Sequence, residues 1–357
     1  MKIAVVVGTR PEIIKMSPVV RALKDRDADF QLIHTGQHYD HYVSDIFFKE
    51  LELQKPDVHL SIGSGSQAEQ TGKALIRLEE AFKNYDVDLV LVQGDTNTVL
   101  AGALAGAKLG IKVGHVEAGL RSYDLRMPEE HNRRVTDHLA DMLFAPTEES
   151  ADILRGEKVM GAVHVTGNTV IDACIQNMEL AEDKADLDFD TPGDFVLITA
   201  HRAENVDNRK VLKQLVEIFE GIPRKKVYPI HPRAEKMFKK TGLYEDLKSI
   251  KGMHVVKPQG YFEFLVLMKR AKYILTDSGG IQEEATAPNI NRKVFVLRDS
   301  TERPEAIDSG HAEVVGTDPD NVLQAIDRFE ENKWKGGRCP YGDGKAGQRI
   351  VDIILQD

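Results

Sequence analysis

Residues able to do acid–base or anion-binding chemistry recur directly after short apolar segments of this chain. They are Gly8-Thr9-Arg10, Gln37-His38, Gly94-Asp95-Thr96, Glu117, His201-Arg202, His231-Pro232-Arg233 and Asp277-Ser278-Gly279-Gly280. The apolar segments are continuous rather than alternating and rich in Val and Ile, which is typical of parallel strands covered on both faces. Since ligands of open parallel sheets bind outside the carboxyl ends of the strands, these residues are candidates for one binding site.

The turn at Gly8–Glu12 could bind an anion. Pro11 suits the first position of a helix, and the backbone N–H groups there would face the anion. Arg10 lies beside them and Lys15 one turn further on. A plain strand-to-helix turn with two solvated cations would have the same sequence, but the other polar strand ends favour binding.

The segment Asp277–Glu284 indicates a nucleotide diphosphate site. Gly279 and Gly280 allow the backbone to approach a phosphate closely, and Ser278 can cap the next helix while donating a hydrogen bond. Glu284, one turn into that helix, would suit a ribose diol. An ordinary Ser N-cap with acidic neighbours is the alternative. Arg303, in a charged segment that could also be a surface turn, could reach the diphosphate.

Three carboxylates are candidates for acid–base work: Asp95, Glu117 and Glu129. Carboxylates that converge on one cleft repel one another, so some should have raised pKa values. Each also has a plainer interpretation, since Asp95 could be a helix N-cap and Glu129 could favour a helix dipole. Glu117 lies between Val116 and Ala118, where a carboxylate needs a partner, and it is the strongest candidate.

Two histidines follow strands at equivalent places, His201 and His231. A single histidine at a strand end is more often structural, but two beside an anion site favour phosphate contacts. A metal site is not predicted. His34, His38 and His41 have a suggestive spacing, but no cysteine or acid pair completes a set of ligands.

Ten predicted strands position these residues. They are Ile3–Val7, Gln31–His34, Leu89–Gln93, Lys112–Val116 and Met142–Ala145, then Phe195–Thr199, Lys226–Ile230, His254–Lys257, Tyr273–Thr276 and Lys293–Leu297. Their alternation with helix-period segments predicts an α/β fold of two Rossmann-like, doubly wound domains facing each other across a cleft.

The domain boundary is predicted at the acidic stretch 181–186, although a solvated helix end and loop would have the same composition. This gives an N-terminal domain over residues 1–180, which carries the carboxylates, and a C-terminal domain over residues 190–335. Residues 345–357 are predicted to form a terminal helix that packs back on the first domain.

Composition excludes several classes of protein. The 357 residues, 41% of them hydrophobic, suffice for two ordinary cores, and the net charge of -10 argues against binding nucleic acid. Cys174 and Cys339 have no metal-ligand spacing, which favours a reducing compartment. The first apolar run stops at Gly8 and is too short to span a membrane. We therefore expect a cytoplasmic protein with no membrane or nucleic-acid partner.

Taken together, eight segments resemble the non-hydrolysing UDP-N-acetylglucosamine 2-epimerases, a family with the two-domain GT-B fold. They are Gly8–Pro18, Gln93–Thr98, Gly114–Arg134, Gly167–Val170, Thr199–Val206, Leu275–Ala285, Arg298–Glu305 and Pro340–Lys345. They span almost the whole chain in the expected order. The chain departs from the family pattern at Ala203, Asn291-Arg292-Lys293 and Cys339, which affects local loop geometry more than activity.

The resemblance implies roles for individual residues. It implies catalytic roles for Asp95, Glu117 and Glu129. We assign His201, which it places near the diphosphate, to the same catalytic group. Contacts to the UDP-sugar fall on Arg10, Lys15, Gln259, Phe264, Ser278, Gly279, Gly280, Glu284 and Arg303, to which we add His231. The C-terminal domain is thus expected to bind UDP. Gln37 and His38 are weak candidates for a second, activating substrate site, which is known in bacterial relatives, and relatives are commonly homodimers.

The implied reaction interconverts UDP-N-acetylglucosamine and UDP-N-acetylmannosamine without a cofactor. The proton on carbon 2 has no neighbouring carbonyl to acidify it, so UDP must leave first, and the family route passes through 2-acetamidoglucal with UDP retained. Three alternatives remain open: a hydrolysing 2-epimerase, a GT-B glycosyltransferase, and a UDP-sugar sensor without turnover. The carboxylates disfavour the sensor, and nothing in the sequence indicates an acceptor site for a transferase.

Overall fold

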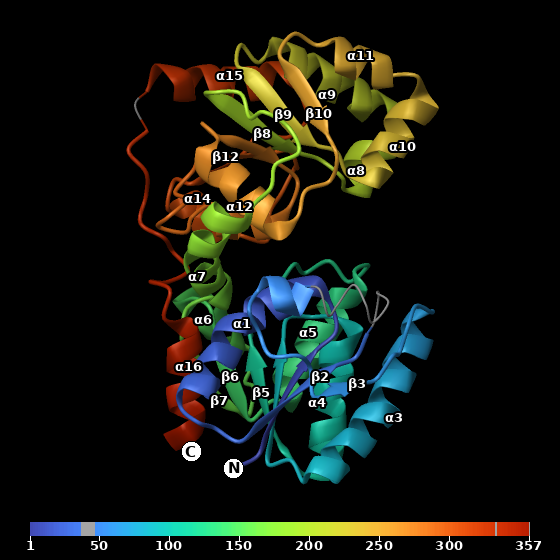
Figure 1. Ribbon diagram of the computed structural model, residues 1–357, viewed down its shortest axis with the longest axis vertical. Helices are drawn as coiled ribbons and strands as arrows, with labels where there is room; N and C mark the ends of the chain where they lie inside the picture. The colour runs from blue at the N-terminus through green and yellow to red at the C-terminus, as the bar shows by residue number, and fades with distance from the viewer. Residues whose placement is uncertain (37–46, 333, 357) are drawn as a thin grey trace. The chain divides into compact units, whose positions relative to one another are not determined.

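The computed structural model describes residues 1–36, 47–332 and 334–356. The chain divides into two compact units: unit 1 is Met1–Ala173 with Tyr341–Asp357, and unit 2 is Cys174–Pro340 (Figure 1). Each unit has its own buried core built on one parallel sheet. Because a sheet buried on both faces needs continuous apolar strands, the Val- and Ile-rich runs of the sequence become the central strands.

Unit 1 contains a seven-stranded sheet in the order β3-β2-β1-β4-β5-β6-β7, with every pair of neighbours parallel. Its strands are β1 (Ile3–Val7), β2 (Phe30–His34), β3 (Val58–His59), β4 (Leu89–Gln93), β5 (Lys112–Val116), β6 (Met142–Ala145) and β7 (Ala162–Val165). All residues of β1 and β4 are buried, so the centre of the sheet is also the centre of the core.

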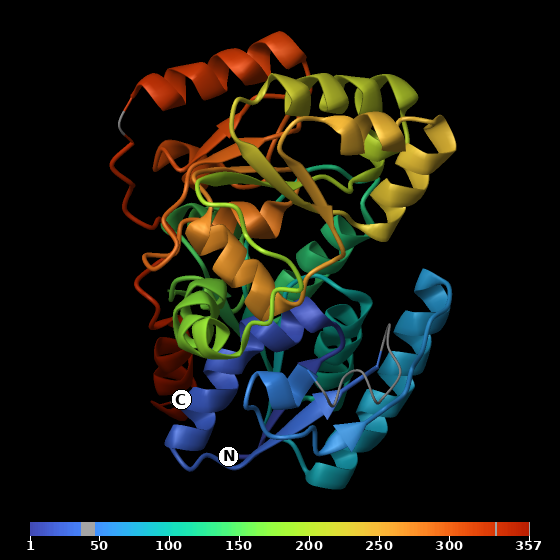
Figure 2. The same cartoon turned by 45° about the horizontal axis from the view of Figure 1, so that its top comes forward.

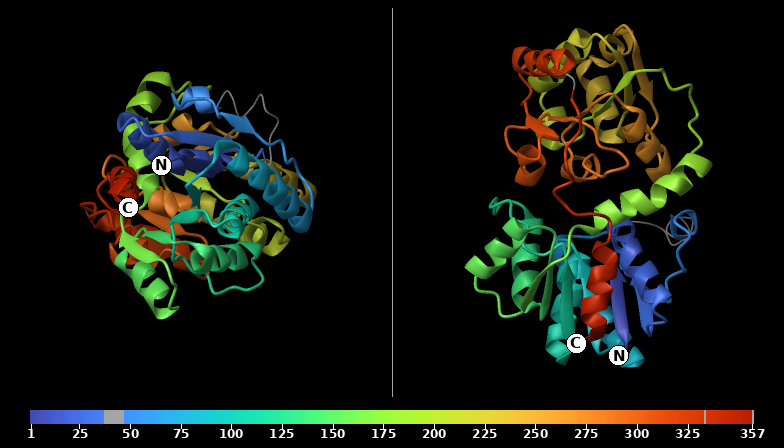
Figure 3. Two further views of the ribbon diagram at one scale, coloured as in Figure 1. Left: turned by 90° about the horizontal axis from the view of Figure 1, so that it is seen from below. Right: turned by 90° about the vertical axis from the view of Figure 1, so that its left-hand side faces the viewer.

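The helices of unit 1 pack on this sheet and on one another. They are α1 (Arg10–Asp25), α3 (Gln67–Tyr85), α4 (Asn97–Leu109), α5 (Pro128–Leu139), α6 (Glu148–Gly156), the start of α7 (Thr169–Lys184) and α16 (Ala346–Gln356). α4 packs on β1, β4 and β5 and against α3 and α5. α16 lies along α1, as Figures 1 and 3 show, and thereby joins the end of the chain to its beginning.

Unit 2 contains a six-stranded parallel sheet in the order β10-β9-β8-β11-β12-β13. The strands are β8 (Phe195–Thr199), β9 (Lys225–Pro229), β10 (Met253–Val256), β11 (Ile274–Thr276), β12 (Val294–Val296) and β13 (Ala312–Val314). The helices are α8 (Ala203–Val206), α9 (Arg209–Gly221), α10 (Pro232–Thr241), α11 (Tyr244–Ser249), α12 (Tyr261–Arg270), α13 (Gly279–Glu284), α14 (Pro304–Asp308) and α15 (Pro319–Glu331). α9 and α15 lie side by side (Figure 2), and Gly221 lets Leu323 approach closely.

All ten strands predicted from the sequence are present, with ends shifted by at most one residue. Three further strands, β3, β7 and β13, were not predicted. The division between units lies within α7 rather than at the acidic stretch 181–186, because α7 continues as a helix through Lys184. No helix of the described residues is long and apolar enough to cross a membrane.

Each sheet reverses its direction of winding at one place, between β1 and β4 in unit 1 and between β8 and β11 in unit 2. Loops that leave neighbouring strands in opposite directions open a crevice at such a point, where ligands of doubly wound sheets bind. Arg10 and Asp95 follow β1 and β4, while His201 and Ser278 follow β8 and β11. The fold therefore places Arg10 and Asp95 at the switch point of unit 1, and His201 and Ser278 at the switch point of unit 2.

Candidate active site

Glu117 is the most constrained carboxylate at the switch point of unit 1. It follows β5 directly, its side chain is 4% exposed, and both its oxygens lie 2.7 Å from Nζ of Lys15. The amide of Gln93 donates a further hydrogen bond to it. The sequence assigned Lys15 to an anion of the ligand; in the structure its ammonium group contacts this carboxylate.

The backbone of Glu117 is strained. Its φ of 67° lies in the left-handed region, which costs a residue other than glycine about 1–3 kcal/mol. Two hydrogen bonds hold this conformation, since the N–H groups of Glu117 and Ala118 both donate to the carbonyl of Phe144 at 3.1 and 3.2 Å. Strain retained at a buried, ion-paired carboxylate is typical of a functional site.

Glu12 is a second buried carboxylate at this switch point, and the sequence analysis did not single it out. Its side chain accepts hydrogen bonds from the N–H groups of Gly8 and Thr9 and, at 2.5 Å, from the hydroxyl of Thr96. Burial raises the pKa of Glu12 to about 7, against the opposing effect of these hydrogen bonds. The Thr-x-x-Glu capping box from Thr9 to Glu12 was the signal that could have revealed it.

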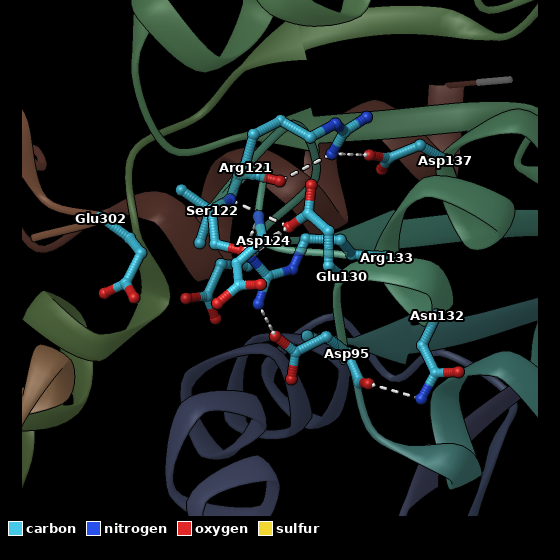
Figure 4. A network of polar contacts seen from close by, with 12 residues as sticks. Asp95, Arg121, Ser122, Asp124, Glu130, Asn132, Arg133, Asp137 and Glu302 are labelled. Carbon is cyan, nitrogen blue, oxygen red and sulfur yellow. Dashed lines mark hydrogen bonds and ion pairs between the residues drawn. The ribbon is translucent and has the colours of Figure 1, made fainter. Parts of the chain in front are cut away.

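Asp95 lies in a network of polar contacts that reaches α5 (Figure 4). Its carboxylate pairs with the guanidinium of Arg133, which also lies 3.0 Å from the fully buried Glu130. The side-chain amide of Asn132 donates to the backbone carbonyl of Asp95 at 2.9 Å. The loop after β4 is therefore fixed through both its backbone and its side chain.

Glu130, the neighbour of the predicted residue Glu129, has a structural role. It accepts hydrogen bonds from the N–H and the hydroxyl of Ser122 at 2.9 and 2.8 Å, which ties the loop before α5 to the helix. Glu129 is half-buried on the first turn of α5. Arg10, at the first position of α1, stacks its guanidinium over the ring of Phe47 at 4.5 Å.

Asp277 organises the switch point of unit 2. One of its oxygens accepts from the N–H groups of His201 and Arg202, both at 2.8 Å, and the other lies 3.2 Å from Nδ1 of His201. Burial opposes ionisation of Asp277, but the hydrogen bonds and the charge of His201, with the N–H of Arg202, keep its pKa below the ordinary value. A buried carboxylate thus orients the His201 ring.

His231 lies beside His201, with the ring centres 5.3 Å apart. It caps α10, and its Nδ1 accepts a hydrogen bond from the N–H of Arg233 at 3.2 Å. Burial and the neighbouring charges of His201 and Arg233 lower the pKa of His231. Two histidines predicted from separate strand ends are therefore brought together.

Arg303 and the glycines of α13 also come together. A side-chain carbon on Gly279 would lie 3.9 Å from the guanidinium carbon of Arg303, and one on Gly280 would lie 3.9 Å from Oγ of Ser278. These are ordinary contacts, so no protein atom requires glycine at either position. The guanidinium pairs with the buried Glu283 and donates to the carbonyl of Glu302 at 3.0 Å. Arg303 is thus held in place beside Gly279.

A model of the family described as UDP-N-acetylglucosamine 2-epimerase matches residues 21–355. A protein of Methanocaldococcus jannaschii with that name is 47% identical, over 99% of both chains. The chain belongs to the UDP-N-acetylglucosamine 2-epimerase family.

Solved structures of the epimerase family have the same fold. The crystal structure of the Methanocaldococcus jannaschii UDP-GlcNAc 2-epimerase in complex with UDP-GlcNAc and UDP superposes with a TM-score of 0.87 at 46% identity, and each chain is covered completely. The enzyme of Neisseria meningitidis, bound to UDP-GlcNAc, gives a TM-score of 0.89 at 36% identity, again with complete coverage. The predicted family and the predicted α/β fold of GT-B type are both confirmed.

Gln259 is half-buried, and its amide donates to the carbonyl of Lys257 at 2.9 Å. Phe264, on α12, and Glu284, on α13, are also half-buried. Gln37 and His38 lie outside the described residues. Within the described part of the chain, no group of three or more His, Cys, Asp or Glu side chains is placed to hold a metal ion.

Proposed function

We propose that the chain interconverts UDP-N-acetylglucosamine and UDP-N-acetylmannosamine by inverting carbon 2 of the sugar, with UDP retained and without a cofactor. Similarity over the full length to proteins named UDP-N-acetylglucosamine 2-epimerase supports this type of reaction. The strained and ion-paired Glu117 is the structural observation that carries it, because a protein that only bound the sugar would not need such a carboxylate.

The proposed reaction balances without a redox partner. When the bond between carbon 1 and UDP breaks, its electron pair leaves with UDP and carbon 1 becomes oxocarbenium-like. The proton on carbon 2 can then pass to a base, which leaves the double bond of 2-acetamidoglucal. A proton returns to the opposite face of carbon 2, and a phosphate oxygen of UDP re-forms the bond to carbon 1.

The two units would divide this work. In unit 1, Asp95, Glu117 and Glu129 would stabilise the cation and move the proton, since carboxylates can do both. Arg10 and Lys15 would contact the substrate and balance the charge of these acids. In unit 2, Arg303 and the backbone of Gly279 and Gly280 would hold the developing charge of the diphosphate.

The remaining residues of unit 2 would complete the nucleotide site. Glu284 would contact the ribose. The diphosphate would be contacted by Ser278, His201 and His231, and the UDP-sugar by Gln259 and Phe264.

We also propose that the protein works as a homodimer in a reducing, cytoplasmic compartment. The two cysteines, both free thiols, support a reducing environment. Sedimentation equilibrium would test the dimer: a mass of twice 39.9 kDa is expected, and the monomer mass at assay concentration would contradict it.

Incubation with UDP-N-acetylglucosamine alone in deuterium oxide, followed by NMR, tests the reaction. We expect deuterium at carbon 2 and an equilibrium mixture of both UDP-sugars, because each passage through the glucal exchanges that proton with solvent. Free UDP with released N-acetylmannosamine would instead show a hydrolase. If no deuterium entered carbon 2, the protein would be a glycosyltransferase or a UDP-sugar sensor.

Glu117→Gln is the variant that ties the reaction to this carboxylate. The amide keeps the shape of the side chain but cannot take a proton, so exchange at carbon 2 should be abolished. The affinity for UDP, measured by calorimetry, should stay within about threefold of the parent, equivalent to about 0.7 kcal/mol. Loss of UDP binding would show that Glu117 is structural.

A further inference from the structure

A buried histidine that the proposed mechanism does not use lies between the two catalytic loops of unit 1. His115, on β5, is fully buried and precedes Glu117 by two residues. Its Nδ1 lies 2.7 Å from a carboxylate oxygen of Asp137 on α5, and its Nε2 lies 2.8 Å from the backbone carbonyl of Gly94. Both ring nitrogens therefore face oxygen atoms.

The hydrogen bonds limit where the protons can be. The carbonyl of Gly94 can only accept, so Nε2 must carry a proton. One more proton lies between Nδ1 and Asp137, and it belongs either to the ring or to the carboxyl group. The ring is an imidazolium in the first case and a neutral imidazole in the second.

The surroundings of Asp137 decide between these cases. Its second oxygen lies 2.7 Å from the guanidinium of Arg121, whose side chain is fully buried, and accepts from the N–H of Gly119 at 3.3 Å. Burial opposes ionisation of Asp137, but the charge and the hydrogen bond of Arg121 favour its ionised form and act to lower its pKa. The proton therefore belongs to the ring.

The same network reaches both loops that carry the proposed catalytic acids. Gly94, which accepts from His115, immediately precedes Asp95, and its own N–H donates to the carbonyl of Val116 at 3.1 Å. Gly119, which donates to Asp137, follows Glu117 by two residues. Gly119 has a φ of 87°, and a side-chain carbon there would lie 2.4 Å from the carbonyl oxygen of Ser150, so this loop has little freedom to move.

We propose that His115 is a positioning residue held as an imidazolium between Asp137 and the carbonyl of Gly94, where it fixes the loops of Asp95 and Glu117 relative to each other. This role rests on the proposed function, because it acts through the two carboxylates. Arg121 completes the charge balance, since it also pairs with Glu157, the residue that follows α6, through two hydrogen bonds of 3.0 and 2.6 Å.

Nitrogen NMR of the full-length protein with labelled histidines tests the charge directly. In assay buffer, the two ring nitrogens of His115, assigned by loss of their signals in His115→Gln, should both have imidazolium shifts. His311 in unit 2 is the matched contrast. It is equally buried, but its ring lies between the hydroxyl of Ser309 and the amide oxygen of Asn291, and burial lowers its pKa to about 4. Neutral shifts for His115 would overturn the proposal.

Kinetics test the positioning role. His115→Gln should lower kcat by about 100-fold while the affinity for UDP stays unchanged, because misplaced acids affect the transition state more than nucleotide binding. His311→Gln, a matched loss of a buried histidine, should leave kcat unchanged. A parental kcat in His115→Gln would refute the role.

Asp137→Asn provides a second variant if His115→Gln does not fold. It removes the charge that holds the imidazolium, so the His115 ring should become neutral and kcat should fall. An unchanged imidazolium signal or an unchanged kcat would contradict the proposal. If the parent protein does not epimerise UDP-N-acetylglucosamine at all, the proposed function fails, whereas the NMR result still decides the charge of His115.

Discussion

Buried carboxylates in unit 1 are stabilised by different partners, and the partner decides what each can do. Glu117 faces the ammonium group of Lys15, Asp137 faces the ring of His115 and the guanidinium of Arg121, and Glu12 accepts hydrogen bonds from uncharged N–H and O–H groups. The sequence identified Glu117 because a carboxylate between apolar residues needs a partner. It could not identify that partner, since Lys15 is 102 residues away in the chain and the contact exists only after folding.

Glu12 should make stability depend on pH in an unusual direction. Because the pKa of Glu12 rises from 4.5 in the unfolded chain to about 7 when folded, the folded protein keeps a proton that the unfolded chain releases. Its contribution is complete below pH 4.5 and is lost as the pH rises through 7. The free energy of unfolding of the parent, relative to Glu12→Gln, should fall over this interval by up to about 3 kcal/mol.

Urea denaturation of both proteins at pH 5 and pH 8 measures this difference. Glu69→Gln is the matched control, since Glu69 holds the same capping-box position in α3 but is exposed, and hydrogen bonds from Ser66 lower its pKa. The free energy of unfolding of the parent, relative to Glu69→Gln, should not fall as the pH rises. A difference between the parent and Glu12→Gln that is the same at both pH values would show that Glu12 is ionised throughout.

At the scale of elements, the sequence predicted the central strands and missed three of the four edge strands, β3, β7 and β13. Central strands are covered on both faces, so they are continuous apolar runs. β7 has exposed residues at both ends and β3 has only two residues, both half-buried, so neither forms such a run. The predicted boundary at 181–186 lies after the division between the units, because acidic residues indicate solvent exposure, which the end of a long helix and a linker share.

Alanine substitutions at two helical glycines should have opposite effects on stability, because Gly347 lies where α16 packs on α1 and Gly72 has open space around it. A side-chain carbon on Gly347 would lie 2.8 Å from the carbonyl carbon of Pro18, and this backbone cannot yield easily. Gly347→Ala should therefore destabilise the protein by about 1–3 kcal/mol. Gly72→Ala, on α3 with open space around it, should stabilise it by about 0.5–1 kcal/mol.

Thermal denaturation of the two alanine variants and of the parent would show whether each substitution raises or lowers the stability. A lower Tm for Gly347→Ala with a higher Tm for Gly72→Ala is expected. Equal shifts would mean that α16 does not depend on close contact with α1.

At the scale of the whole molecule, one topology occurs twice with different chemistry. Both sheets begin with the doubly wound order and reverse direction between their first and fourth strands. At that point unit 1 carries Glu12, Asp95 and Glu117, whereas unit 2 carries histidines, glycines and Arg303. In the proposed reaction a cationic sugar and an anionic leaving group would need different surroundings, and the carboxylates of unit 1 and the arginine and glycines of unit 2 would supply them.

This division predicts where UDP protects the backbone from hydrogen exchange. Saturating UDP should slow exchange most in unit 2, in peptides that contain Ser278–Gly280 and Arg303, because the diphosphate would be held there. Uridine, which lacks the diphosphate, should give much less protection of the same peptides at equal occupancy. Ligand at about 100 times its Kd adds about 2.7 kcal/mol of stability, enough to resolve by exchange mass spectrometry. Protection confined to unit 1, or equal protection by uridine, would show that the diphosphate is bound elsewhere.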